Sequence, residues 1–266
     1  MRDSELTQVR RLPLFRSMAD QRFSPLMRAA YHHTFPAYLQ LIEEGASADF
    51  LHIVLDGSVE LYASWQDRET TMAVVRPVST FILAACIKDA PYLMSARTLE
   101  TTRVILVPSV DLRAVFQADH EFAMATITEL AACYRSVVRH TKDIKLRDAR
   151  ERLAAYILRK TRDSKGASFI IPVEKRLLAS YLGVTPESLS RTMKSLQDAG
   201  AKVDGQRVII TNRKALEAVA HPSPLIDGPD CEDTGTCLAF QGVSRGEETG
   251  SESPASAGSK SYRSTM

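Results

Sequence analysis

Three polar residues in the C-terminal half of the chain could read the edges of DNA bases. Glu187, Ser190 and Arg191 recur at helical spacing, with Lys194 one turn further on. Arginine can donate two hydrogen bonds to guanine, glutamate can accept one from cytosine, and serine can pair with either. Phosphates would repel a carboxylate, so Glu187 in a basic segment favours base contact. Its alternative role is to stabilise the dipole at the helix N-terminus.

The surrounding residues predict the helix that would position these side chains. Thr185 is a good N-cap, and Pro186 suits the first helical position. A shorter helix should precede it, with a hinge at Gly183, which together give a helix-turn-helix. The face opposite the polar cluster carries three apolar residues at the spacing of a buried stripe, namely Leu189, Met193 and Leu196.

The flanking segments extend this motif into a winged helix-turn-helix domain, which we expect over residues 147–220. A helix is predicted from Asp148 to Thr161, and Asp204-Gly205 marks a hairpin between two extended runs. Residues 147–220 hold 15 Lys and Arg against 8 Asp and Glu, a net charge of +7. Such a concentration of positive charge is expected where a domain neutralises phosphates, although a solvated basic surface would also produce it.

A long helix is predicted over residues 119–146, before this domain. Apolar or small residues recur there in alternating steps of three and four over three heptads, which favours pairing with a second helix. Packing of a simple amphipathic stripe on the preceding domain is the alternative. We therefore expect a homodimer whose interface includes Ile127, Leu130, Tyr134, Val137, Thr141 and Ile144, with Ala123 starting the repeat.

The first part of the chain predicts a β-barrel after a short helical region that ends near Ala30. Short strands broken by turn signals follow one another from Phe35 to Pro108, which is typical of a jelly roll. Asp56-Gly57 is the clearest hairpin signal among them. We expect residues 1–118 to form an effector-sensing domain, and the fold class to be α+β.

Composition excludes several other classes. No apolar run approaches the ~18 residues of a membrane span, and the N-terminus lacks an apolar signal core, so we expect a cytoplasmic protein with no membrane contact. The usual hydrolase, metalloprotease and nucleotide motifs are absent, so we expect no catalytic residues and no enzyme activity. The four cysteines are scattered and suggest neither a disulfide framework nor a metal site: Cys86, Cys133, Cys231 and Cys237.

The last 46 residues, 221–266, are rich in Ser, Gly, Pro, Glu and Thr and have few large apolar side chains. Such a segment cannot offset the entropy cost of ordering, so we expect a disordered tail. Cys231 and Cys237 within it could bind a metal or oxidise, but no second pair completes a zinc site.

With these residues in view, residues 12–220 resemble the Crp/Fnr family of bacterial transcription regulators. The order of parts is similar, and the run from Glu187 to Arg191 looks like the E-x-x-S-R motif of Fnr-type members. The barrel is similar at Gly45 and over residues 55–62. The resemblance implies a homodimer that binds double-stranded DNA and acts on RNA polymerase.

The resemblance also implies a palindromic site with TTGA-like half-sites. Arg191 would contact guanine, Glu187 the cytosine of the complementary strand, and Ser190 thymine. The residues expected to contact DNA are therefore Thr185, Glu187, Ser190, Arg191 and Lys194.

The barrel departs from the cyclic-nucleotide binders of this family. Residues 81–85 replace a Gly-Glu pair, and Met94 stands where those proteins carry the arginine that binds the cyclic phosphate. A buried phosphate without a cation would be costly, which argues against cAMP. Because the first cysteine is Cys86, a four-cysteine iron–sulfur cluster at the N-terminus is also excluded. We expect an effector pocket that includes Leu83, Tyr92, Leu93, Met94 and Ser95.

Residues 90–100 look most similar to the nitric-oxide-responsive NnrR and Dnr regulators of denitrification genes. That similarity implies nitric oxide as the signal, with haem as a possible cofactor. Haem needs an axial ligand such as His or Cys, and no histidine lies in a specific ligation motif: His32, His33, His52, His120, His140 and His221. Carbon monoxide, redox state or an organic metabolite are alternative signals. A signalling module that binds a ligand but no DNA is the alternative of a different class.

Overall fold

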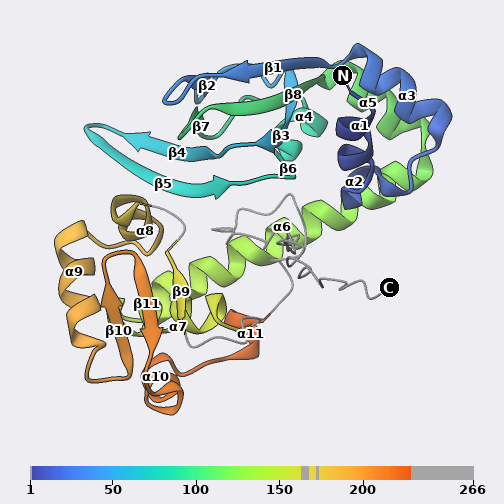
Figure 1. The fold of residues 1–266 in the computed structure, drawn as a ribbon. Helices are drawn as coiled ribbons and strands as arrows, with labels where there is room; N and C mark the ends of the chain where they lie inside the picture. The colour runs from blue at the N-terminus through green and yellow to red at the C-terminus, as the bar shows by residue number, and fades with distance from the viewer. Residues whose placement is uncertain (1, 163–167, 172–173, 229–266) are drawn as a thin grey trace, which may run out of the picture.

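Two four-stranded sheets face each other in the N-terminal half, and a long helix leads from them to a smaller three-stranded sheet (Figure 1). This computed structural model describes residues 2–162, 168–171 and 174–228. The mixed α+β architecture and the order of barrel, long helix and helix-turn-helix are as predicted. None of the described helices is long and apolar enough to cross a bilayer.

Three helices precede the barrel, and the last of them ends one residue before Ala30, as expected. Phe15 and Phe122 stack with ring centroids 6.0 Å apart, so these helices are packed against the start of the long helix. Both rings are fully buried. The helices are α1 (Asp3–Arg10), α2 (Pro13–Arg16) and α3 (Asp20–Ala29).

All strand pairs in the barrel are antiparallel, as in a jelly roll. One sheet has the order β1 (Tyr31–Phe35), β8 (Thr102–Pro108), β3 (Phe50–Asp56) and β6 (Ser79–Phe81). The other has the order β2 (Gln40–Ile42), β7 (Ser95–Thr98), β4 (Val59–Trp65) and β5 (Arg68–Val75). A short helix, α4 (Leu83–Lys88), follows β6.

The hairpin predicted at Asp56-Gly57 is wrong. Strand β3 pairs with β6 and β8, whereas β4 pairs with β5 and β7, so the chain crosses from one sheet to the other at this turn. Gly57 has φ +83°, and a Cβ there would lie 2.6 Å from the Thr101 carbonyl oxygen. The turn signal was correct, but a turn does not specify which strand pairs with which.

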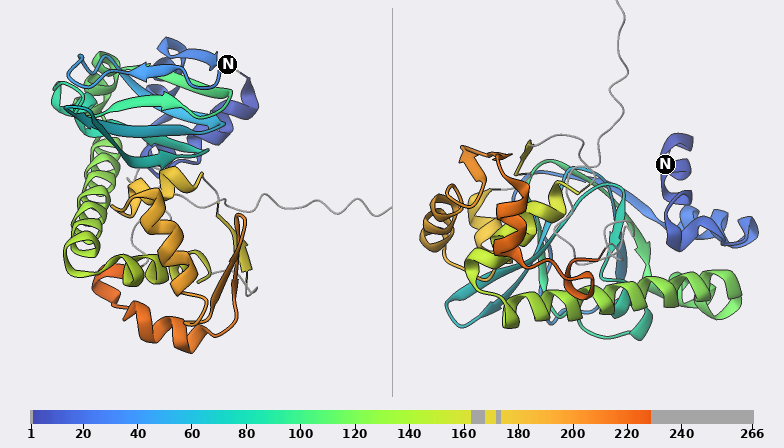
Figure 2. Two further views of the ribbon diagram at one scale, coloured as in Figure 1. Left: turned by 90° about the vertical axis from the view of Figure 1, so that its left-hand side faces the viewer. Right: turned by 90° about the horizontal axis from the view of Figure 1, so that it is seen from below.

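The long helix α6 (His120–Leu146) follows α5 (Ser109–Ala118) directly. The Asp119 side chain caps it by accepting a hydrogen bond from the Phe122 N–H at 2.9 Å. In both views of Figure 2, α6 runs from the barrel to the C-terminal helices. It therefore connects the barrel to the C-terminal part of the molecule.

The C-terminal part has the predicted winged helix-turn-helix arrangement. Asp148 and Glu151 form a capping box at the start of α7 (Ala149–Lys160). The wing turns at Gly205-Gln206, one residue later than predicted, because Asp204 pairs with Arg207. The remaining elements are β9 (Ser168–Ile170), α8 (Lys175–Tyr181), α9 (Pro186–Ser195), β10 (Ala201–Asp204), β11 (Arg207–Ile210) and α10 (Arg213–Ala220), with the sheet order β10-β11-β9.

The prediction of a disordered tail from residue 221 is wrong for its first eight residues. A further short helix, α11 (Pro224–Asp227), packs against α6, and Asp227 is only 6% exposed. Average composition missed it because one carboxylate paired with buried arginines holds the segment in place. Residues 229–266, with Cys231 and Cys237, lie outside the described residues.

Candidate nucleic-acid interface and apolar pocket

The exposed face of α9 carries the predicted polar cluster. Thr185 caps the helix, its hydroxyl oxygen accepting a hydrogen bond from the Ser188 N–H at 3.2 Å. Leu189, Met193 and Leu196 are buried, as predicted, and fix which side of the helix faces outward. All five residues expected to contact DNA are exposed: Thr185, Glu187, Ser190, Arg191 and Lys194.

These side chains offer both acceptors and donors. The pKa of Glu187 is lowered by hydrogen bonds from the Glu187 backbone N–H and the Thr185 hydroxyl, and by the charge of Arg191. Its carboxylate is therefore ionised at neutral pH and can only accept. The Ser190 hydroxyl donates to the Pro186 carbonyl at 2.9 Å, which leaves its oxygen lone pairs free to accept. Arg191 supplies the donors.

Gly183 and Gly200 shape the turns on either side of α9. Gly183, with φ +65°, makes the turn between α8 and α9. Gly200 has φ +89°, and a Cβ there would lie 2.3 Å from the Asn212 carbonyl oxygen. Both positions favour glycine, so any other residue would strain the turns that flank α9.

Further cations surround α9 that sequence reasoning did not single out. Arg150 donates to the Ser195 carbonyl at 3.3 Å, near the C-terminal end of α9. The signal for these residues was the net charge of the segment, which gives no positions. The exposed ones are Arg150, Lys175, Arg176, Lys202 and Arg207, the last two lying in the wing.

Some residues of the predicted dimer interface on α6 are exposed, and others are half-buried. Ile127 is 52% and Tyr134 71% exposed, and Val137 and Thr141 are also exposed. Leu130 instead packs against the barrel core, and Ile144 is half-buried close to Gly183. Two unpredicted residues, Met124 and Val138, are exposed beside the first set. We call the exposed apolar set the α6 stripe: Met124, Ile127, Tyr134, Val137 and Val138.

An apolar pocket of about 130 Å³ lies between the barrel and α6. Three predicted effector residues, Leu83, Leu93 and Met94, line it, and α6 adds Leu130 and Cys133. The other two predicted residues do not line it. The Tyr92 hydroxyl donates to the Phe50 carbonyl at 3.2 Å, and the Ser95 hydroxyl oxygen accepts from the Glu44 N–H at 3.0 Å.

No charged side chain belongs to the described lining of this pocket. Arg97, three residues after Met94, donates to Glu60 at 2.8 Å, pairs with Glu69, and lies over the Tyr62 ring at 4.3 Å. It is therefore already committed to other partners. Without a cation, the pocket is poorly suited to a cyclic phosphate.

The pocket as shaped here also does not fit haem. Drug-sized ligands occupy pockets of roughly 300–1,000 Å³, and haem is not smaller than these. Cys133 is the one usual axial ligand in the lining. His52 is buried in β3 beside Phe81, and burial lowers its pKa to about 4, so the ring is neutral. The described residues contain no group of three His, Cys, Asp or Glu placed to hold a metal.

Strand β5 connects this pocket to the helix-turn-helix. Val75 lines the pocket, whereas its neighbour Val74 points to the other face and is buried with the apolar core of the C-terminal domain. The Thr71 N–H donates to the Ser180 hydroxyl oxygen at 2.6 Å, and the Thr70 hydroxyl lies 3.1 Å from it. Movement at the pocket wall can therefore reach α8 directly.

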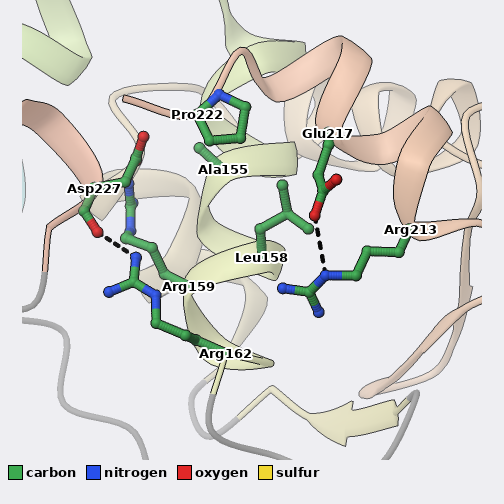
Figure 3. A pocket seen from close by; sticks show the side chains of 8 residues that line it. All are labelled: Ala155, Leu158, Arg159, Arg162, Arg213, Glu217, Pro222 and Asp227. Carbon is green, nitrogen blue, oxygen red and sulfur yellow. Dashed lines mark hydrogen bonds and ion pairs between the residues drawn. The ribbon is translucent and has the colours of Figure 1, made fainter. Parts of the chain in front are cut away.

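A second pocket of about 110 Å³ lies among α7, α10 and the segment after α10 (Figure 3). Four of its five charged side chains pair with each other, Arg159 with Asp227 at 2.8 Å and Arg213 with Glu217 at 3.0 Å. The fifth, Arg162, donates a hydrogen bond to the Asp227 backbone carbonyl. Each of these charged groups already has a partner within the chain, so we assign no ligand to this pocket.

Two family models match the chain. The Crp-like helix-turn-helix domain matches residues 151–219, and the cyclic nucleotide-binding domain matches residues 32–119. The probable transcriptional regulator flp of Lacticaseibacillus casei is 22% identical over 211 residues, which are 79% of this chain and 96% of flp.

Solved structures with the same fold support these matches. FixK2 from Bradyrhizobium japonicum is 22% identical, with a TM-score of 0.63 over 73% of this chain and 98% of its own. A mutant of CooA from Carboxydothermus hydrogenoformans is 14% identical, with a TM-score of 0.66 over 83% of this chain and 97% of its own. At these identities, the likeness shows the shared fold.

Proposed function

Because this chain belongs to the Crp/Fnr family of DNA-binding transcription regulators, we propose that it binds a palindrome of TTGA-like half-sites as a homodimer. One observation carries this proposal: Glu187, Ser190 and Arg191 are exposed together on α9, while the opposite face of the helix is buried. In this assignment Arg191 donates to guanine, Glu187 accepts from cytosine, and Ser190 contacts thymine. RNA polymerase is the proposed protein partner.

The cations around α9 support binding to the phosphates on both sides of the base contacts. Lys194, Arg150 and the wing residue Arg207 are all exposed. Phosphate contacts fix orientation without reading sequence, and they make affinity fall as salt rises. The domain thus has the two kinds of contact that specific DNA binding needs.

A titration of labelled duplexes tests this proposal. The full chain should bind a TTGA palindrome more tightly than the same duplex with both half-sites scrambled, and both affinities should fall steeply with salt. Equal affinity for the two duplexes would contradict base reading. Failure to bind either duplex at low salt would favour the signalling module without DNA binding.

We assign the dimer interface to the α6 stripe. Exposed apolar side chains at heptad spacing on a long helix are buried when two such helices pair. Of the predicted seam, Ile127, Tyr134 and Val137 meet this requirement, and Thr141 extends it toward the DNA-binding domain. Leu130 and Ile144 already pack within the chain, so we do not include them in the interface.

Nitric oxide is the proposed signal, with denitrification genes as targets. An uncharged apolar pocket that includes α6 and is adjacent to β5 supports a small uncharged ligand over a nucleotide. Occupancy would shift β5 and α6, both of which contact the helix-turn-helix region. Carbon monoxide, redox state and an organic metabolite are the alternative signals.

Absorption spectra separate these signals. The purified protein is titrated with haem and then exposed to nitric oxide or carbon monoxide, and DNA affinity is measured in parallel. A nitric-oxide-specific change in affinity supports the assignment. A change with carbon monoxide or oxidant alone moves the assignment to that signal.

A further inference from the structure

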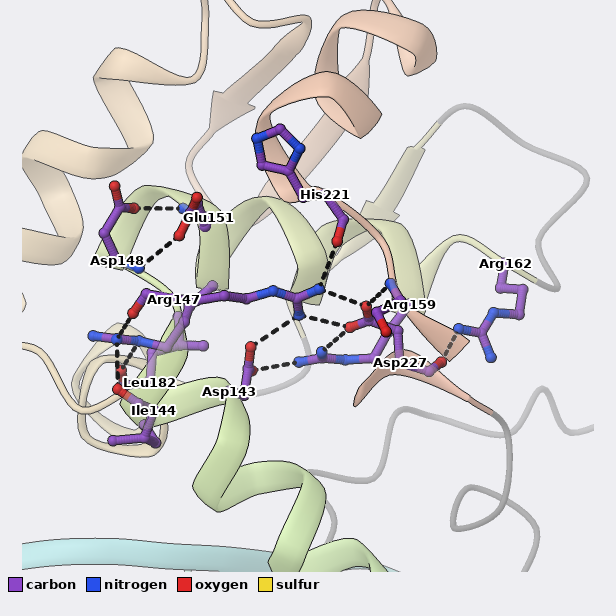
Figure 4. A network of polar contacts seen from close by, with 12 residues as sticks. Asp143, Ile144, Arg147, Asp148, Glu151, Arg159, Arg162, Leu182, His221 and Asp227 are labelled. Carbon is purple, nitrogen blue, oxygen red and sulfur yellow. Dashed lines mark hydrogen bonds and ion pairs between the residues drawn. The ribbon is translucent and has the colours of Figure 1, made fainter. Parts of the chain in front are cut away.

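The segment that follows α10 folds back across the junction between α6 and α7 (Figure 4). Asp227 in this segment binds Arg147 through both carboxylate oxygens, at 2.8 and 2.7 Å. Arg147 lies between the two helices and is 8% exposed, and Asp227 is 6% exposed. Bidentate pairing of this kind fixes the orientation of both partners.

The charges in this buried cluster balance only when Asp227 is present. Arg147 and Arg159 contribute two positive charges, and Asp143 contributes one negative charge at 3.0 Å and 3.4 Å from them. Asp227 supplies the second negative charge, 2.8 Å from Arg159. Removing it would leave two buried guanidinium groups with one carboxylate, and an uncompensated buried charge is strongly destabilising.

Backbone contacts tie the segment to α6 and α7 along its length. Arg139 of α6 donates to the Gly228 carbonyl at 3.0 Å, and Arg147 donates to the His221 carbonyl at 3.1 Å. Arg162, just after α7, donates to the Asp227 carbonyl. The contacts therefore reach the dimer helix on one side and the DNA-binding domain on the other.

We propose that Ser223–Gly228, which we call the strap, sets the angle between α6 and the DNA-binding domain. The strap lies beyond residues 151–219, which the helix-turn-helix family model matches. The inference rests on the proposed function, because in a dimer built on α6 this angle determines the distance between the two α9 helices. Half-sites lie about 34–36 Å apart, so a change in angle changes which spacing is bound.

The test uses Asp227→Asn in the full chain, with Glu217→Gln as the matched control. Both changes convert a carboxylate to an amide in the C-terminal part, but Glu217 belongs to a solvent-accessible pair outside the strap. Arg152 also spans the junction, donating to the Leu182 carbonyl at 2.9 Å and the Ile144 carbonyl at 3.3 Å. We therefore expect Asp227→Asn to loosen the junction without unfolding the domain.

The first readout is hydrogen exchange without DNA, so it does not depend on the proposed function. Exchange should rise at residues 139–150 in Asp227→Asn and stay unchanged in α8, α9 and the barrel. Unchanged exchange at the α6–α7 junction would overturn the proposed role of the strap. A rise throughout residues 149–220 would overturn it too, since Asp227 would then hold the core of the domain.

The second readout is affinity for palindromes whose half-site spacing varies by one base pair at a time. Asp227→Asn should lose affinity at the best spacing by about 5- to 150-fold and bind the other spacings more evenly. Glu217→Gln should match the unmodified chain. A uniform loss at every spacing, with the preference kept, would overturn control of the angle. If the unmodified chain binds none of the duplexes, the proposed function fails. The exchange result still shows whether the strap holds the α6–α7 junction.

Discussion

Glu187 and Arg191 lie about one helical turn apart on the exposed face of α9 and present opposite chemistry to a partner. Glu187 is ionised at neutral pH, and hydrogen bonds from its backbone N–H and from Thr185 lower its pKa further. An ionised carboxylate is repelled by phosphate, and its favourable partner on DNA is the amino group of cytosine. In the proposed interface the pair would combine selection for one base with selection against backbone contact.

Glu187→Gln tests this at the level of one side chain. The amide can donate as well as accept, so preference for cytosine at the contacted position should fall roughly tenfold. Thermal unfolding should change little, because the side chain is exposed and its interactions at the helix N-terminus contribute little to stability there. Titrations against the four bases at that position provide the measurement. An unchanged preference would assign Glu187 to the helix dipole alone.

These residues could be found from the sequence because their types carry the chemistry and the helical period places them together. Asp227 could not be found in this way. Its partners Arg147 and Arg159 are 80 and 68 positions away, and nothing in the local composition links them. Tyr92 and Ser95 show the same limit, since resemblance placed them near the pocket while hydrogen bonds direct them elsewhere.

Among the elements of the fold, α6 has one buried face and one exposed apolar face. One face is buried at Phe122, Thr126 and Glu129, and Phe122 stacks on Phe15 of α2. The other face leaves the α6 stripe exposed to solvent. Periodicity predicted the helix and its exposed apolar residues. It could not assign Leu130, because a seam and a barrel-facing stripe have nearly the same spacing.

Charged substitution of the stripe should separate the subunits. Ile127→Glu places a carboxylate at the centre of the proposed interface, and we expect monomers in sedimentation experiments with weakened DNA binding. Ile127→Leu is the matched control, since it changes the same position of the α6 stripe and keeps an apolar side chain of similar volume. A dimer that persists in Ile127→Glu would move the interface away from α6.

In the whole molecule, barrel, α6 and helix-turn-helix form one connected unit. The pocket includes α6, β5 contacts α8, and the strap contacts both α6 and α7. The sequence predicted the order of these parts, since each has its own pattern. The connections between the parts depend on single residues such as Ser180 and Asp227, which follow no pattern.

The strap should also affect stability in acid. Burial would raise the pKa of Asp227, but hydrogen bonds from Arg147 and the Ser223 N–H and the charge of Arg159 lower it from 3.8 to about 2. A lowered carboxyl pKa stabilises the fold above pH 3.8, and this contribution is lost as the pH falls toward 2. We expect Asp227→Asn to reduce the unfolding free energy at pH 7 by about 2 kcal/mol. Denaturant unfolding at pH 7 and pH 2 should show a difference that nearly vanishes in acid, and a difference equal at both would contradict the pairing.

A base-by-base scan of one half-site, with the unmodified chain and with Arg191→Ala, tests whether α9 reads bases. Arg191→Ala should lose about 1–3 kcal/mol of binding free energy on the unmodified site and become indifferent to substitution of the contacted guanine. All other positions should keep their preferences. If both proteins show the same preference at every base, the proposed reading of bases by Arg191 on α9 is wrong.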